Sequence, residues 1–145
     1  MATAFDVAKY IVERLGPMPA MKLQKLVYYS QAWTLVWDDA PLFQNAIEAW
    51  THGPVVRDLS EAYRAEFTVG PDDIRGDSSN LTFAEIESID SVLEDYGRHS
   101  AQWLSDKTHT ETPWQEARKG LGETERGNTV ISLKSIAEYY AFLDD

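Results

Sequence analysis

The chain has 145 residues, a length that favours a single domain spanning residues 1–145. Hydrophobic residues make up 43% of it and aromatic residues 12%, which excludes a disordered chain and is enough for a real core. The net charge of -11 argues against binding to nucleic acid, and the absence of cysteine excludes disulfides and thiolate metal sites.

No segment of the sequence is of the kind that enters a membrane or directs export. No stretch approaches the roughly 20 consecutive apolar residues of a membrane-spanning helix. Residues 1–6 lack the basic region and the apolar run of a signal peptide. We therefore expect a soluble, cytoplasmic protein that makes no contact with a membrane.

Helical periodicity predicts two helices at the start of the chain. The first spans residues 4–15, with Thr3 as its N-cap and Gly16 at its end. The second spans about residues 20–37 and is apolar on almost every side, a pattern typical of a buried helix. We therefore place the second helix at the centre of the domain. One face of this helix carries Leu23, Leu26, Val27, Trp33 and Trp37.

The middle of the chain is predicted to contain a strand, a short helix and a long loop. Residues 47–50 alternate apolar and polar side chains, as a half-buried strand does. His52-Gly53-Pro54 should break this strand, with Pro54 as the first residue of a helix that ends near Arg64. Residues 66–82 have the composition of a loop and are the best candidate for a mobile segment.

Four more helices are predicted in the second half of the chain. One follows a capping box of Thr82 and Glu85 and ends at Gly97 in a left-handed conformation. A helix capped by Ser100 comes next, then a short helix from Thr112 to Ala117, a brief strand near 129–131 and a helix over 133–143. The side chains predicted to point inward from the first and last of these helices are Phe83, Ile86, Ile89, Leu93 and Tyr96, and Leu133, Ile136, Ala137, Tyr140 and Leu143.

These elements predict a mainly α fold. We expect a compact single-domain helical bundle of about six or seven helices around the central helix at about 20–37. One or two short β-strands should accompany it, at about 47–50 and 129–131.

The sequence contains no recognisable catalytic or metal-binding motif. His52, His99 and His109 lack the spacing of zinc ligands, and there is no glycine-rich phosphate loop. We therefore expect no metal and no cofactor. His109 and Glu111 have the chemistry of an acid–base pair, but they precede a helix start, where such residues commonly act as caps. Capping is the preferred interpretation, and an enzyme built on this pair is the alternative.

Two groups of side chains are candidates for binding a partner protein. Glu87, Asp90 and Glu94 share one helical face, which is either a solvated outer surface or a docking surface for a basic protein. Trp50 and Trp114 either pack at corners of the fold or anchor an interface.

Four blocks of the sequence resemble the Panacea domain family. The first two are Lys22-Leu-Gln-Lys-Leu-Val-Tyr-Tyr-Ser-Gln-Ala-Trp33 and Pro41-Leu-Phe43. The others are Ile47-Glu-Ala-Trp50 with Gly53-Pro-Val-Val56, and Leu104-Ser-Asp-Lys-Thr-His109 followed by Glu111-Thr-Pro-Trp114. The order and spacing of the blocks match the family, and the resemblance covers roughly residues 4–143.

The resemblance implies an antitoxin of prokaryotic or phage origin, and no catalysis. Panacea domains are encoded beside many unrelated toxins and neutralise them by direct contact, so the expected partner is a cognate toxin encoded by a neighbouring gene. A SocA-like member instead delivers its toxin to the ClpXP protease, so a proteolytic adaptor is the alternative. Residues 66–82 or the tail 141–145 would then tether the protease. We expect partner binding by Trp50, His52, Arg57, Glu87, Asp90, Glu94, His109 and Trp114.

Overall fold

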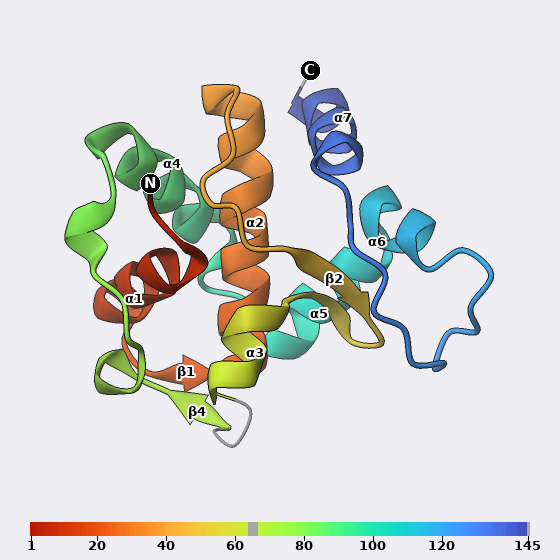
Figure 1. Ribbon diagram of the computed structural model, residues 1–145, viewed down its shortest axis with the longest axis horizontal. Coiled ribbons are helices and arrows are strands. Elements are labelled where there is room, and N and C mark those ends of the chain that lie inside the picture. The colour runs from red at the N-terminus through yellow and green to blue at the C-terminus, as the bar shows by residue number, and fades with distance from the viewer. Residues whose placement is uncertain (64–66, 145) are drawn as a thin grey trace.

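The computed structural model describes residues 1–63 and 67–144, and these residues are mainly helical, as predicted (Figure 1). The α-helices are α1 (Ala4–Leu15), α2 (Ala20–Asp38), α3 (Arg57–Tyr63), α4 (Phe83–Tyr96), α5 (Ala101–His109), α6 (Thr112–Ala117) and α7 (Leu133–Asp144). The strands are β1 (Met18–Pro19), β2 (Ile47–Trp50), β3 (Gly53–Val56) and β4 (Thr68–Val69). Two 3-10 helices are η1 (Pro71–Asp73) and η2 (Ser78–Asn80).

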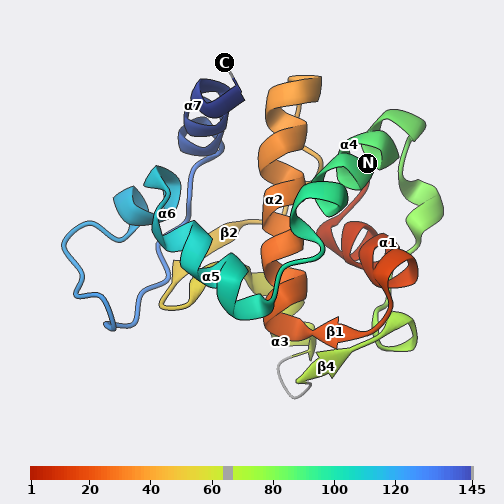
Figure 2. The same ribbon diagram turned by 180° about the vertical axis from the view of Figure 1, so that it is seen from behind.

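Helix α2 is the centre of the fold, which confirms the prediction from its apolar sequence. Helices α1 and α4 pack on one side of it, while α7, α5 and strand β3 pack on the other (Figures 1 and 2). Every residue from Leu23 to Ala32 is buried, so no face of this stretch is left for water. Trp37, in the last turn of α2, is an exception to the burial predicted for this helix: it is 39% exposed and stacks on Trp33.

Two buried glutamines of α2 bind extended segments of the chain. The Gln31 side chain donates to Phe43 O at 2.8 Å and accepts from Leu42 N at 2.7 Å. Gln24 accepts from Val56 N at 2.8 Å and donates to Val56 O at 3.2 Å. Since buried backbone groups need hydrogen-bond partners, these amides fix the position of the segments around α2.

Strands β2 and β3 form an antiparallel hairpin, with Ile47 opposite Val56 and Trp50 opposite Gly53. The prediction that Pro54 starts a helix was wrong, because Pro54 lies in β3 and α3 begins at Arg57. Gly53 has a φ of 121°, a conformation that glycine adopts readily, and it allows the chain to reverse instead of starting a helix there. The predicted helix end at Arg64 lies outside the described residues.

The strand expected near 129–131 is present as a single bridge between Val130 and Glu48. Two backbone hydrogen bonds of 2.8 Å flank the bridge, from Ile131 N to Ile47 O and from Ala49 N to Thr129 O. This segment therefore covers the edge of β2 that faces away from β3.

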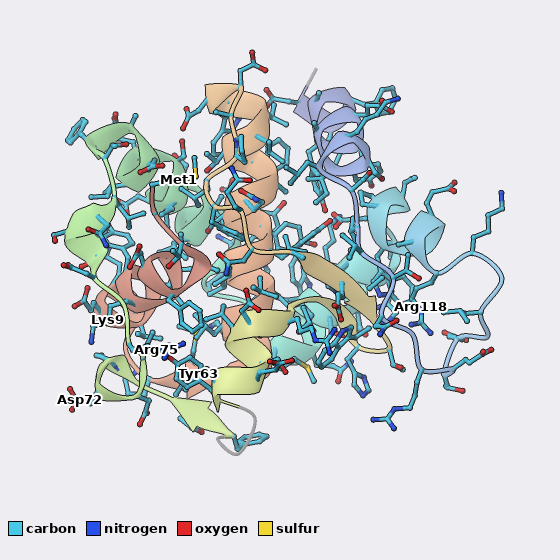
Figure 3. All side chains as sticks on the ribbon, viewed as in Figure 1. Met1, Lys9, Tyr63, Asp72, Arg75 and Arg118 are labelled. Atoms are coloured by element: carbon cyan, nitrogen blue, oxygen red, sulfur yellow. The ribbon has the colours of Figure 1, made fainter. Side chains whose placement is uncertain are left out.

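The segment predicted as a loop over 66–82 contains β4, η1 and η2 and packs along α1. Strand β4 pairs with β1, and the side chains of Ile74 and Leu81 are buried. Asp6 of α1 accepts a hydrogen bond from Asp77 N at 2.8 Å, and Lys9 donates to Pro71 O (Figure 3 labels Lys9). Mobility of this segment stays a prediction.

Three residues predicted to point inward are exposed instead. Phe83 is 78% exposed because it is the first residue of α4, ahead of the turns that pack against α2. Leu133 and Leu143 are 40% and 47% exposed, and the buried side of α7 is formed by Ile136 and Tyr140. Gly97 ends α4 with a φ of -64°, so the predicted left-handed cap was also wrong.

Candidate functional site

The β2–β3 hairpin and the helices next to it bring five of the eight predicted partner-binding residues into one region. Trp50 and His52 lie at the tip of the hairpin, and Arg57 follows it as the first residue of α3. His109 is the last residue of α5, and Trp114 lies in α6 beside it. We call this region, defined by these five residues, the hairpin corner.

His109 and Trp114 fasten the tip of the hairpin to α5 and α6. The two ring nitrogens of His109 lie 2.5 Å from Ser105 O and 2.9 Å from Thr51 O. Trp114 donates its indole N–H to Trp50 O at 2.8 Å, and its ring packs on His109 with centroids 4.0 Å apart. Because the Trp114 side chain is buried and both rings are engaged, these two residues position the hairpin from within the fold.

Glu48, Trp50 and Arg57 form a second set of contacts on the hairpin. Glu48 is 5% exposed and accepts the indole N–H of Trp50 at 2.8 Å. Its other carboxylate oxygen lies 3.4 Å from a guanidinium nitrogen of Arg57, which also pairs with Glu61 at 3.0 Å. These contacts orient the indole of Trp50 while leaving Arg57 and His52 exposed.

Arg118, which the sequence did not single out, holds the following loop against the hairpin (Figure 3). It is 5% exposed and donates to Ala49 O at 3.1 Å and to Gly122 O at 3.2 Å, and a further bond reaches Glu125 O. Its guanidinium also lies 5.2 Å from the ring centroid of Trp114. The sequence signal was weak, because an arginine at the end of a short helix is usually solvated.

A groove of about 810 Å³ opens between α2, the hairpin tip, α3 and the loop after α6. Its lining includes Leu23, Gln24 and Lys25 of α2, Trp50, Thr51, His52 and Val55 of the hairpin, Leu59, Ser60 and Tyr63 of α3, and Arg126, Gly127 and Asn128 of the loop. Two of the predicted partner-binding residues, Trp50 and His52, therefore line the groove.

Lys25 is the most unusual side chain in the groove. It is 1% exposed, and its ammonium donates to Pro54 O at 3.1 Å. Within residues 1–63 and 67–144, no carboxylate forms an ion pair with it. Burial in this setting lowers the pKa of Lys25 to about 7, since desolvation disfavours the charged form. Lys25 belongs to the first of the four sequence blocks that resemble the Panacea domain family, and it was not among the predicted partner-binding residues.

The three acidic candidates on α4 lie away from the hairpin corner, on the other side of α2 (Figures 1 and 2). Asp90 accepts a hydrogen bond from the Tyr10 hydroxyl at 2.6 Å and lies 3.9 Å from Arg14 of α1. Glu87 and Glu94 are exposed. The predicted residues thus form two separate groups, and Asp90 is partly occupied in holding α1 against α4.

Glu111 does not make the contact with His109 that the alternative acid–base interpretation requires. It is the N-cap residue of α6, but its side chain makes no capping hydrogen bond, contrary to the preferred interpretation. One of its oxygens instead accepts hydrogen bonds from the hydroxyls of Tyr29 at 2.8 Å and Tyr140 at 2.7 Å. Tyr140 also contacts the Tyr28 hydroxyl at 3.1 Å, so the cluster joins α2, the start of α6 and α7. Burial raises the pKa of Glu111, and the other oxygen has no hydrogen-bond partner among the described residues. The geometry therefore gives Glu111 a structural role rather than an acid–base pair with His109.

The described residues were compared with the requirements of a metal site and of a membrane-spanning helix. Within residues 1–63 and 67–144, no three His, Asp or Glu side chains gather closely enough to hold a metal ion. None of the helices in these ranges combines the length and the apolar character that crossing a bilayer requires.

The chain is thus mainly helical, and His109 and Trp114 hold the tip of the β2–β3 hairpin at its surface. The chain matches the family described as Antitoxin SocA-like, Panacea domain, over residues 23–115. Since this match covers more than half of the chain, the chain belongs to that family, as its sequence blocks predicted. The matched residues run from α2 to α6 and are narrower than the expected 4–143. Comparisons with curated proteins and with solved structures returned no match.

Proposed function

We propose that this chain is the antitoxin of a toxin–antitoxin system and neutralises its cognate toxin by direct binding. The toxin would be encoded by a neighbouring gene, and the two proteins would meet in the cytoplasm. The observation that carries the proposal is the family match, which spans the hairpin corner from Trp50 to Trp114. We infer no catalytic role, because His109 and Glu111 are each engaged by other groups of the fold.

The hairpin corner supports the proposal because its surface is held in place before any partner arrives. His109 and Trp114 fix the backbone of the tip, while His52 and Arg57 are exposed on it. A surface that is already ordered loses less conformational entropy on binding. Trp50 adds an aromatic ring of the kind that often dominates binding energy.

The test is co-expression of the chain with the product of the neighbouring gene, read by growth and by affinity pull-down. Growth rescue with a stable complex supports a direct-binding antitoxin. Absence of both rescue and complex would refute it. A variant of the chain with both His52→Ala and Arg57→Ala should form a weaker complex if the hairpin corner binds the toxin.

The acidic face of α4 supplies the matched comparison for that experiment. Glu87→Ala with Glu94→Ala changes two exposed side chains on the other side of α2. Loss of binding only in this pair would move the interface to α4 and favour a basic toxin surface. Equal binding by both paired variants and the unchanged chain would refute both predicted interfaces.

A proteolytic adaptor is the second candidate function. The observation that favours it is the end of α7, where Phe142 is 76% and Leu143 47% exposed. Exposed apolar side chains on a terminal helix are suited to contact another protein. In this version the toxin level falls when the chain is expressed. Growth rescue that persists in cells lacking the ClpXP-type protease would eliminate it.

A further inference from the structure

The groove beside the hairpin reverses the electrostatic character of the chain. The sequence has 24 acidic residues against 13 lysines and arginines. Among the described residues that line the groove, none is acidic, whereas Lys25 and Arg126 both line it. A hollow lined by one sign of charge between low-dielectric walls concentrates ligands of the opposite sign. The groove is therefore suited to an anionic occupant despite the overall charge of -11.

Lys25 gives this charge a defined position. Its ammonium has three N–H donors, and Pro54 O is the acceptor that the described residues provide. The side chain also passes close to the hairpin, because a Cβ at Gly53 would lie 2.6 Å from Lys25 Cε. A buried lysine without a carboxylate partner is unfavourable for the fold, since the charge has lost water without gaining a counterion. A carboxylate entering the groove would supply the missing acceptors.

Apolar side chains form another part of the lining and set the character of the rest of the occupant. It includes Leu23, Val55, Leu59 and Val69, from four different elements. The Trp50 indole N–H is already bonded to Glu48, so its ring is left for apolar contact. Burial of apolar side chains on such a surface contributes affinity, while the buried amine of Lys25 contributes orientation.

We propose that the groove receives a segment of the toxin in which a carboxylate lies beside apolar side chains, with Lys25 as the counterion of that carboxylate. This inference rests on the proposed function, because it names the site at which the toxin docks. It assigns the main role in binding to Lys25, which lies one α-helical turn after Lys22 and, unlike Lys22, lines the groove.

The first experiment measures binding of the purified product of the neighbouring gene to three forms of the chain. Lys25→Met keeps the volume of the side chain and removes the charge, and Lys22→Met is the matched control on the same helix. We expect Lys25→Met to weaken the complex by about 30-fold or more, as loss of one partner of a buried charge pair does. We expect Lys22→Met to bind like the unchanged chain. Circular dichroism verifies that both variants are folded.

The second experiment identifies the group that contacts Lys25. A carbodiimide activates a carboxylate, and the Lys25 amine then forms an amide bond with it while the carbodiimide leaves as a urea. Mass spectrometry of the cross-linked complex should find Lys25 joined to an acidic side chain or to the C-terminal carboxylate of the toxin. The identity of the cross-linked residue shows whether the carboxylate belongs to an acidic side chain or to the C-terminus of the toxin.

The outcomes separate this inference from the proposed function. If the unchanged chain does not bind the toxin, the proposed function fails and the inference fails with it. If the unchanged chain binds but Lys25→Met binds equally well, or cross-links avoid Lys25, the groove is not the carboxylate site and the antitoxin function stands.

Discussion

Replacing Lys25 with methionine also tests the energetics of the central helix without any partner. Burial lowers the pKa of Lys25 from 10.5 to about 7. Between these two pH values the unfolded chain binds a proton that the folded chain does not, so stability rises with pH. From pH 7 to pH 9, a single group with this shift raises the free energy of unfolding by about 2 kcal/mol.

The assay is urea unfolding of the chain and of Lys25→Met at pH 7, 8 and 9, followed by tryptophan fluorescence. The unchanged chain should gain about 2 kcal/mol over this range relative to the variant, because methionine has no proton to bind. Lys25→Met should also be the more stable protein at pH 7, since an apolar side chain avoids the desolvation of an ammonium. Parallel pH dependence in the two proteins would refute the argument that Lys25 is buried without a counterion.

Three further substitutions test other parts of the fold. Gln24→Ala removes the side-chain hydrogen-bond partners of the buried N–H and C=O of Val56. It should lower the free energy of unfolding by about 2–4 kcal/mol in urea. An unchanged urea midpoint would show that these two hydrogen bonds contribute little to stability. Gly53→Ala should lower the melting temperature, because the φ of 121° strains alanine and its Cβ would lie 2.6 Å from Lys25 Cε; equal melting would show that the hairpin relaxes freely. The raised pKa of Glu111 makes the folded chain hold a proton that the unfolded chain releases, so the stability of the unchanged chain should fall as the pH rises above 4.5. Glu111→Gln should remove this fall. The same fall in both proteins would assign the pH dependence to other groups.

Local sequence patterns predicted most of the helices, and long-range contacts account for what they missed. The 3.6-residue periodicity and the capping residues Thr82 and Ser100 lie within each helix, so the sequence alone reveals them. The hairpin depends on pairing between Ile47 and Val56, and the sequence contains the competing signal of Pro54, which also starts helices. The prediction therefore failed where pairing between distant residues decides the structure, as it does for this hairpin and for β1 with β4.

The candidate site was predicted as residues but not as an arrangement. Trp50 and Trp114 were predicted as corner or interface residues, but their link through Trp50 O depends on α6 folding back onto the hairpin. Lys25 and Glu111 carry charges, and on propensity alone charged residues are expected at the surface. Their burial follows from acceptors and donors supplied by β3 and α7, which no pattern in their own helices indicates.

The two walls of the groove come from parts of the chain with different constraints. The wall from α2 lies within the matched residues 23–115 and belongs to the core. The opposite wall, residues 126–128, lies outside the match, in a loop that Arg118 holds in place through backbone carbonyls alone. Because carbonyls are the same in every residue type, these bonds do not depend on the side chains of Gly122 and Glu125. Gly127 is constrained instead, since a Cβ there would lie 3.2 Å from an Arg118 guanidinium nitrogen. One wall of the groove therefore depends on a backbone anchor and a glycine, and the other on the packed core.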